Sequence, residues 1–294
     1  MVQDYLRVRR ALGFALVEVG HTLEGFLAYL HAHGSDAVTI DNALAYATAA
    51  QGASRRTQAL RLSAVRGFTR WAHTLDASIQ VPPARLLPAR PTRAVPFIYT
   101  TGQVADLLGA ADRLHPAIRA ATFHALVALM AATGIRTGEA LGLGLDDFDP
   151  HAGTLTVTGK YHKIRTLPLH HSVVDALGDY VRQCPRPRPA GGGPPPLLIS
   201  RGGGRLGRGS VHPTFRSLTA QVGLTAVSPA CRPRLHDLRH TFAVNTLLDA
   251  YRRGEDPNVT LPILSTWLGH ADPGDTYWYY SDSRVIPMPA PSCA

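Results

Sequence analysis

The sequence predicts a mainly α-helical chain of the α+β class, divided into two domains, the second of which carries a small antiparallel sheet. Three observations predict this: helical spacing of apolar residues over the first ninety or so residues, a proline-rich stretch at 81–96, and two β-like runs at 154–158 and 164–169. The chain has 294 residues, long enough for one large domain or two ordinary ones, and with 45% hydrophobic and 17% charged residues it can bury a core.

The N-terminal segment has the periodicity of amphipathic helices. Apolar residues recur at helical spacing at Leu23, Phe26, Leu27 and Leu30. A second helix follows Thr39 or Asp41, either of which can cap it. From Ser54 onward a longer helix is expected, with apolar residues on or near one face at Leu60, Val65, Phe68 and Trp71. Its other side carries Arg55, Arg56, Arg61, Arg66 and Arg70. This basic side suits contact with phosphates, although an ordinary solvated face is the simpler alternative.

The charge balance points to a polyanionic partner. Lys and Arg total 30 against 21 Asp and Glu, giving a net charge of +9 and a pI near 9.9. Nucleic acid is the commonest partner for a surplus of this size. The three cysteines are widely spaced and form no CxxC pair, so neither a disulfide framework nor a zinc knuckle is expected. The sequence shows no signal peptide and no apolar run long enough to span a membrane, which favours a cytoplasmic protein.

The segment 81–96 holds five prolines in sixteen residues and predicts a stiff, extended linker. We therefore expect a helical domain over 1–86, a proline-rich linker over 87–96 and a second domain over 97–294. The second domain begins after a cap at Thr100 or Thr101 and continues with a strongly apolar helix that Gly134 ends.

The two β-like runs of the second domain are separated by GKYHK (159–163) and predict a β-hairpin. Helical patterns follow at 210–222, 236–251 and 260–268, and again near the C-terminus. The segment 185–196 (PRPRPAGGGPPP) is of low complexity and is expected to form a surface loop.

Four local motifs in the second domain could carry chemistry, although each alone has an ordinary structural explanation. In TGIRTGEALGL (133–143), Arg136 stands at the start of a helix, where a guanidinium can hold a phosphate. In HDLRH (236–240), His236 and Arg239 are three residues apart and share a helix face. His236 and His240 could also suggest a metal, but Asp237 stands where HExxH requires glutamate.

The other two motifs are GKYHK, with Lys160 and Lys163 at the hairpin tip, and WLGH (267–270), which Tyr279 follows nine residues later. Taken in order, the four motifs resemble the tyrosine recombinase/phage integrase family, with spacing similar to that of Xer recombinases. The resemblance covers most of the chain. It implies the tyrosine recombinase fold, in which 1–86 corresponds to the helical core-binding domain and 97–294 to the catalytic domain.

The resemblance also implies the site. The family's catalytic pattern falls on Arg136, Lys160, His236, Arg239, His270 and Tyr279. Lys163 matches a second, less regular lysine. Tyr277 and Tyr280 compete with Tyr279, but the interval from His270 selects Tyr279. Glu139 also fits the pattern, as a brace for the helix that begins at Arg136.

The implied reaction is cleavage and rejoining of DNA through a 3′-phosphotyrosine. Arg136 and Arg239 would hold the phosphate, His236 would take the phenol proton, Lys160 would protonate the leaving 5′-oxygen, and His270 would donate a hydrogen bond. No metal or other cofactor is expected. The expected partners are double-stranded DNA and a homo- or hetero-tetramer on paired sites, in the bacterial cytoplasm at the nucleoid.

Integration, transposition and chromosome or plasmid resolution all remain open as the cellular role. The alternatives are DNA relaxation of the type IB topoisomerase kind and a non-catalytic DNA-binding relative. Relatives usually continue past the tyrosine into a helix that docks on a neighbouring subunit. Three prolines in the last eight residues argue against such a helix here.

Overall fold

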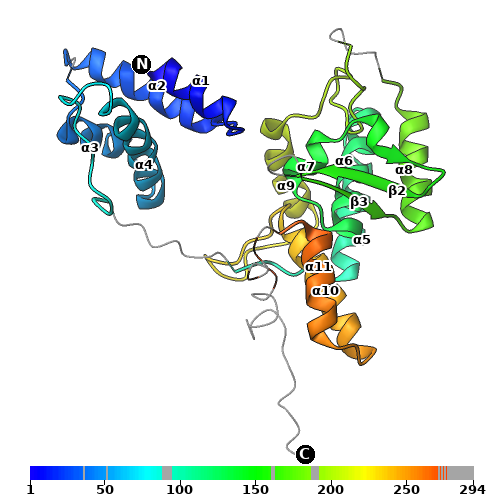
Figure 1. Cartoon of the computed structure of the whole chain (residues 1–294). Helices are drawn as coiled ribbons and strands as arrows, with labels where there is room; N and C mark the ends of the chain where they lie inside the picture. The colour runs from blue at the N-terminus through cyan, green and yellow to red at the C-terminus, as the bar shows by residue number, and fades with distance from the viewer. Residues whose placement is uncertain are drawn as a thin grey trace, which may run out of the picture. The chain divides into compact units, whose positions relative to one another are not determined.

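The computed structural model describes residues 1–35, 37–50, 52–87, 95–159, 163–186 and 192–270, together with Asp272, Gly274 and Thr276. The chain forms two compact units, Met1–Arg93 and Ala94–Ala294 (Figure 1). Both are mainly helical, and the second carries the one sheet of the described residues, which confirms the predicted fold class. Within the described residues, no helix combines the length and apolar character needed to cross a membrane.

The first unit contains four helices, as the apolar periodicity predicts. They are α1 (Val2–Ala11), α2 (Val17–Ala32), α3 (Ile40–Thr48) and α4 (Arg55–Ala72). Thr39 caps α3 by accepting a hydrogen bond from the Asn42 amide at 3.1 Å, and Ser54 caps α4 in the same way from Thr57 at 3.2 Å. The core is built around Phe26 of α2, with the buried residues of the other helices packed against it.

The prediction for Leu60 is wrong, because its side chain is 61% exposed. The inward face of α4 is set instead by Leu62, Val65 and Phe68, which are all buried. Two residues turn a helix by about 200°, so Leu60 points away from the face that Leu62 occupies.

The basic side of α4 is divided in the structure. Arg61 lies over the Tyr46 ring, with its Cζ 5.2 Å from the centroid. Arg66 donates through Nε to the Pro82 carbonyl at 3.0 Å. The other three arginines of this side, Arg55, Arg56 and Arg70, are exposed and available to a partner.

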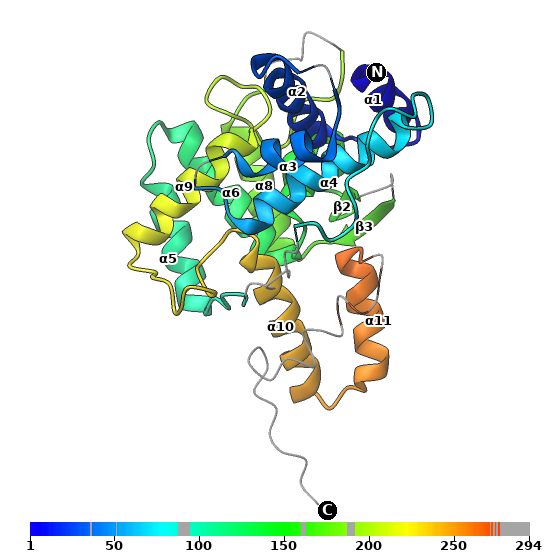
Figure 2. The same cartoon turned by 90° about the vertical axis from the view of Figure 1, so that its left-hand side faces the viewer.

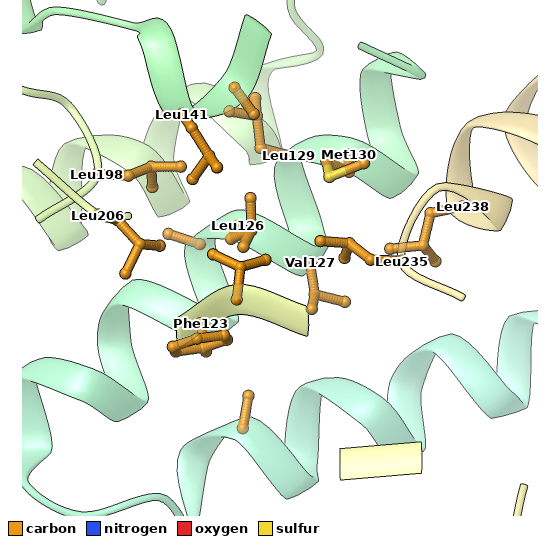
Figure 3. Packing of buried hydrophobic residues seen from close by; sticks show 14 of the residues in the cluster. Phe123, Leu126, Val127, Leu129, Met130, Leu141, Leu198, Leu206, Leu235 and Leu238 are labelled. Atoms are coloured by element: carbon orange, nitrogen blue, oxygen red, sulfur yellow. The ribbon is translucent and has the colours of Figure 1, made fainter. Parts of the chain in front are cut away.

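The second unit is built on α6, a buried helix. The helices of this unit are α5 (Thr101–Asp112), α6 (Ala117–Thr133), α7 (Thr137–Gly142), α8 (His171–Gln183), α9 (Arg208–Gln221), α10 (Asp237–Arg252) and α11 (Pro257–Leu268). Figure 3 shows Phe123, Leu126 and Met130 of α6 surrounded by leucines from other segments. As predicted, Thr100 caps α5 and Gly134 ends α6, with a left-handed φ of 64°.

The sheet is antiparallel with strand order β1-β2-β3, formed by β1 (Phe148–Asp149), β2 (Thr154–Thr158) and β3 (Ile164–Pro168). The predicted hairpin is confirmed: Thr158 pairs with Ile164, and the Gly159 amide donates to the Lys163 carbonyl at 2.8 Å. Residues 160–162 of the turn lie outside the described residues.

The C-terminal helices α10 and α11 form an adjacent pair, as both views show (Figures 1 and 2). Buried Val244 and Leu247 of α10 pack against Leu261 and Leu264 of α11. Because the chain reverses between them, the start of α10 and the end of α11 lie at the same end of the pair, next to Gly134 at the end of α6.

Candidate active site

The end of α11 is the centre of the candidate site. A helix leaves its last four carbonyls without helical partners. Here two are satisfied by main-chain bonds around Gly269: the Gly269 amide donates to Thr266 at 3.0 Å and the His270 amide to Ser265 at 3.1 Å. Gly269 has a φ of 65°, which glycine adopts without strain, so WLGH is a helix-terminating motif that fixes the backbone of His270.

The other two of these carbonyls, and that of Gly269 just after the helix, each accept a hydrogen bond from a different arginine. The bonds, each 2.8 Å long, run from Arg165 Nε to Trp267, from Arg239 Nη2 to Leu268 and from Arg136 Nη2 to Gly269. The carbonyl end of a helix carries partial negative charge, which favours cations there. Three guanidinium groups from distant parts of the chain are thereby held around one helix end.

Glu139 ties two of these arginines together. Its carboxylate accepts from the Arg136 amide at 2.9 Å and from Arg136 Nη1 at 2.8 Å. It also accepts from Arg165 Nη2 at 2.8 Å and Nη1 at 3.2 Å. Burial alone would raise the pKa of Glu139, but the hydrogen bonds and charges of the two arginines hold it below its ordinary value. The expected bracing role of Glu139 is confirmed by these contacts.

Arg239 is the most deeply buried of the three arginines, at 1% exposure. Besides its bond to Leu268, it donates through Nη1 to the Gly134 carbonyl at 2.8 Å. It therefore joins the ends of α6 and α11. We call Arg136, Arg165, Arg239 and Glu139 the arginine cluster: three cations against one carboxylate leave a surplus of two positive charges.

His236 lies at the start of α10, beside this cluster. Its ring meets that of His240 edge-on, with centroids 5.0 Å apart and planes at 86°. Desolvation and the charges of Arg239, Arg234 and Arg136 lower the pKa of His236 to about 4. The imidazole is therefore neutral at pH 7 and can accept a proton.

Asp237, the next residue, has a structural role in this turn. It is fully buried, and its carboxylate accepts from the Arg234 amide at 3.0 Å and from the Arg234 guanidinium at 2.7 and 3.0 Å. Burial raises its pKa in spite of these bonds. Asp237 therefore anchors the segment that presents His236.

Among the described residues, no group of three or more His, Cys, Asp or Glu is placed to hold a metal ion.

His270 follows the arginine-capped end of α11. Its Nδ1 lies 2.6 Å from the Thr276 hydroxyl, which is buried. The structure thus brings together four of the predicted residues, Arg136, His236, Arg239 and His270. Lys160 and Tyr279 lie outside the described residues, as do the rival tyrosines Tyr277 and Tyr280. Lys163, the lower-ranked lysine, is exposed and directly precedes β3 of the hairpin.

Arg165 is the residue that sequence reasoning missed. The sequence signal that could have revealed it is the alternation of inward and outward residues along β3. Arg165 and Leu167 face inward, while Ile164, Thr166 and Pro168 are exposed. Arg165 also stands opposite Val157, which is fully buried, so the two share the inward face. An arginine on a buried strand face requires partners, and its partners here are Glu139 and the end of α11.

Comparisons with known proteins identify the family of the chain. Residues 99–284 match the model of the phage integrase family. The chain is 40% identical over 291 residues to the candidate integrase/recombinase y4rB of Sinorhizobium fredii, covering 97% of this chain and 93% of that protein. It is 33% identical over 270 residues to the tyrosine recombinase XerD of Mycobacterium tuberculosis, covering 90% and 78%.

Among solved structures, the Tn1549 transposon integrase in complex with a circular intermediate DNA has a similar fold. The TM-score is 0.66 at 18% sequence identity, and the match covers 95% of this chain and 94% of that one.

Proposed function

The chain belongs to the phage integrase family of tyrosine-type DNA breaking-and-rejoining enzymes, and from that premise we propose that it cleaves DNA by forming a 3′-phosphotyrosine at Tyr279. The observation that carries the proposal is the arginine cluster. It gathers Arg136 and Arg239 at one helix end, beside His236 and His270, with a surplus of positive charge. Such a site stabilises an anion, and the scissile phosphodiester is one.

The phosphate would be bound by the guanidinium groups. Arg136 has 28% of its side chain exposed, and its two side-chain hydrogen bonds to described residues use two of the five N–H donors of a guanidinium. It can therefore add bonds to a phosphate oxygen without releasing Glu139 or Gly269. Arg239 contributes its positive charge from a buried position, where water screens the charge less.

In the proposed step, the Tyr279 oxygen attacks phosphorus and the bond from phosphorus to the 5′-oxygen breaks. The phenol proton passes to His236, which is neutral because desolvation and the neighbouring cations lower its pKa to about 4. A bound phosphate would offset those cations and raise the proton affinity of His236. We assign Lys160 to protonate the leaving oxygen and His270 to donate a hydrogen bond to the phosphate. Attack by a 5′-hydroxyl reverses the step and rejoins the strand.

We further propose that the enzyme recombines paired double-stranded DNA sites as a homo- or hetero-tetramer, at the nucleoid in the bacterial cytoplasm. Its role would be either in a mobile element, including transposition, or in chromosome or plasmid resolution. The similarity to y4rB and XerD and the fold of the Tn1549 integrase support recombination as the outcome. The helical first unit would serve as the core-binding domain, consistent with the exposed arginines of α4.

A nicked suicide duplex tests the chemistry, because loss of the short fragment beyond the nick prevents religation. We expect the wild-type chain to form a protein–DNA adduct that survives denaturation, and Arg136→Ala to form none. A wild-type chain that binds its site without forming an adduct would refute the catalytic function. A two-site strand-exchange assay, run beside relaxation of a one-site supercoiled plasmid, then tests recombination; relaxation alone would favour the topoisomerase-like alternative.

A further inference from the structure

Arg165 joins the β2–β3 hairpin to the arginine cluster. Its side chain is only 14% exposed, and all its described hydrogen bonds go to Glu139 and the Trp267 carbonyl. Gly159, at the base of the turn, lies against the same groups: a β-carbon there would be 3.3 Å from Glu139 Oε1 and 3.5 Å from Arg165 Nη1. The residue after Gly159 in the chain is Lys160, so the hairpin reaches its turn directly beside the arginine cluster.

The phosphate-binding arginines do not depend on Arg165 for their other contacts. Arg136 keeps both bonds to Glu139 and its bond to Gly269, and Arg239 keeps its bonds to Gly134 and Leu268. Pairing of the hairpin with β1 is confined to Leu155 and Thr154, at the opposite end of β2 from Gly159. At the turn end, Val157 of β2 packs in the core, and Arg165 supplies the hydrogen bonds of β3 to Glu139 and α11. Loss of Arg165 would therefore loosen the β3 side of the turn, while the other contacts of Arg136 and Arg239 remain.

We propose that Arg165 is a positioning residue that fixes the turn end of the hairpin to Glu139 and to the end of α11. The inference rests on the proposed function, in which the hairpin supplies Lys160 to protonate the leaving 5′-oxygen. Arg165 itself touches neither DNA nor the reacting atoms. Lysine cannot replace it fully, because one ammonium cannot fork onto both oxygens of Glu139 and also reach Trp267.

The test compares two suicide substrates, one with an ordinary scissile phosphate and one with sulfur in place of the bridging 5′-oxygen. A thiol, with a pKa of about 8.5, leaves without a proton, whereas a hydroxyl, whose pKa is far higher, requires one. A defect confined to leaving-group protonation is therefore relieved by sulfur. Lys160→Ala serves as the reference for such a defect and Arg136→Ala as the reference for loss of phosphate binding.

The variants are Arg165→Ala and, in case the alanine variant does not fold, Arg165→Lys. Arg186→Ala is the matched control, because Arg186 also satisfies main-chain carbonyls, at Pro196 and Leu197, but contacts no member of the arginine cluster. We expect both Arg165 variants to cleave the ordinary substrate about 10- to 100-fold more slowly, as a part of the effect of general acid catalysis, with DNA affinity within threefold of wild type. On the sulfur substrate, the cleavage rates of the Arg165 variants and of Lys160→Ala should come within about threefold of the wild-type rate. Arg186→Ala should cleave both substrates at the wild-type rate.

Three results would overturn the inference. Wild-type cleavage of the ordinary substrate by both Arg165 variants would show that the contact does not matter to catalysis. Equal slowing on both substrates would show that Arg165 supports phosphate binding or the fold, not the hairpin. A wild-type chain that forms no adduct with either substrate would refute the proposed function and with it this inference, whereas a Lys160→Ala variant that sulfur does not rescue would refute the role of Lys160 and this inference alone.

Discussion

At the scale of single residues, the two arginines proposed to bind the phosphate, Arg136 and Arg239, differ in how much of the fold depends on them. Arg239 is 1% exposed and bridges the ends of two helices, whereas Arg136 is 28% exposed at its side chain and shares Glu139 with Arg165. Removing Arg239 leaves the Gly134 and Leu268 carbonyls without this donor inside the protein. Each buried carbonyl left unpaired costs about 1–3 kcal/mol.

We therefore predict that Arg239→Ala and Arg136→Ala both abolish the covalent adduct but differ in stability. Two such carbonyls cost about 2–6 kcal/mol, so at about 2–4 °C per kcal/mol for a unit of this size Arg239→Ala should lower the Tm by roughly 4–24 °C, and Arg136→Ala by clearly less. Thermal unfolding followed by circular dichroism measures both. Equal decreases in Tm would contradict the bridging role of Arg239, and an adduct formed by either variant would contradict its binding of phosphate.

His236 carries a prediction about pH. Its pKa is about 4 in the folded chain and about 6.5 when unfolded, so between these values the unfolded state holds one more proton. Stability contributed by the neutral imidazole is therefore complete above pH 6.5 and falls as the pH is lowered toward 4. Relative to His236→Asn, the wild-type chain should show a falling Tm between pH 7 and pH 5. Parallel Tm curves for the two proteins over that range would show that the pKa is not lowered.

At the scale of elements, the glycine that ends α11 has two separate functions. Its φ of 65° lets the chain leave the helix, and its missing side chain lets Arg165 approach: a β-carbon at Gly269 would lie 2.7 Å from Arg165 Nη1. Gly254 separates these functions, since it has a φ of 70° but no atom within 4 Å of its β-carbon position. It is therefore the matched control for backbone strain.

We predict that Gly269→Ala and Gly254→Ala share a decrease in stability of about 1 kcal/mol from the left-handed backbone. Only Gly269→Ala should also slow covalent cleavage, by at least tenfold, because Arg165 must move and the end of α11 with it. Single-turnover cleavage at saturating DNA measures this. Equal cleavage rates in the two variants would show that the close approach of Arg165 to Gly269 has no catalytic consequence.

The elements were largely predictable from sequence because local rules specify them. Thr39 and Thr100 cap helices, Gly134 ends α6, and the hairpin has the predicted strands, all of which follow from short-range preferences. Leu60 shows how such rules fail, because an apolar residue near a helix start can point either way until the core is known. The proposed catalytic residues, by contrast, follow from the family resemblance, since each motif alone is ambiguous.

The arginine cluster could not be predicted in the same way. Arg165 meets the Trp267 carbonyl 102 positions later in the chain, and Arg136 meets Gly269 across 133 positions. No local pattern encodes such pairings, which depend on how α6, α7, α10 and the hairpin pack. The alternation of β3 reveals only that Arg165 faces inward, and the packing then supplies its partners.

At the scale of the whole molecule, the first unit would contribute DNA affinity and the second the chemistry. Arg56 and Arg70 of α4 are exposed and have no acidic partner among the described residues. Arg252 in the second unit is also exposed, but its guanidinium pairs with Asp249 at 3.0 Å. A chain neutralised at Arg56 and Arg70 can thus be compared with one neutralised at Arg252.

We predict that Arg56→Ala together with Arg70→Ala weakens site binding and lowers the slope of log affinity against log salt by about 0.9 for each DNA phosphate that the protein no longer neutralises. The single-turnover cleavage rate at saturating DNA should stay within about twofold of wild type, because these residues bind the backbone and not the scissile phosphate. Arg252→Ala should change neither quantity. An unchanged salt slope in the double variant would contradict a DNA-binding role for this side of α4.

How the active complex assembles stays a prediction, because residues 277–294, which would contribute to subunit docking, lie outside the described residues. The expectation that this proline-rich segment does not form a docking helix stays a prediction. It bears on how subunits associate on paired sites, whereas the nucleophile assignment depends on Tyr279 alone and can be tested without synapsis.

The most direct measurement is covalent capture on a nicked suicide duplex by the wild-type chain and by Tyr277→Phe, Tyr279→Phe and Tyr280→Phe. We predict that Tyr279→Phe binds the duplex with near wild-type affinity and forms no adduct, while the other two variants retain it. An adduct that persists in Tyr279→Phe, or that disappears only in Tyr277→Phe or Tyr280→Phe, would contradict the central claim that Tyr279 attacks the phosphate held by the arginine cluster.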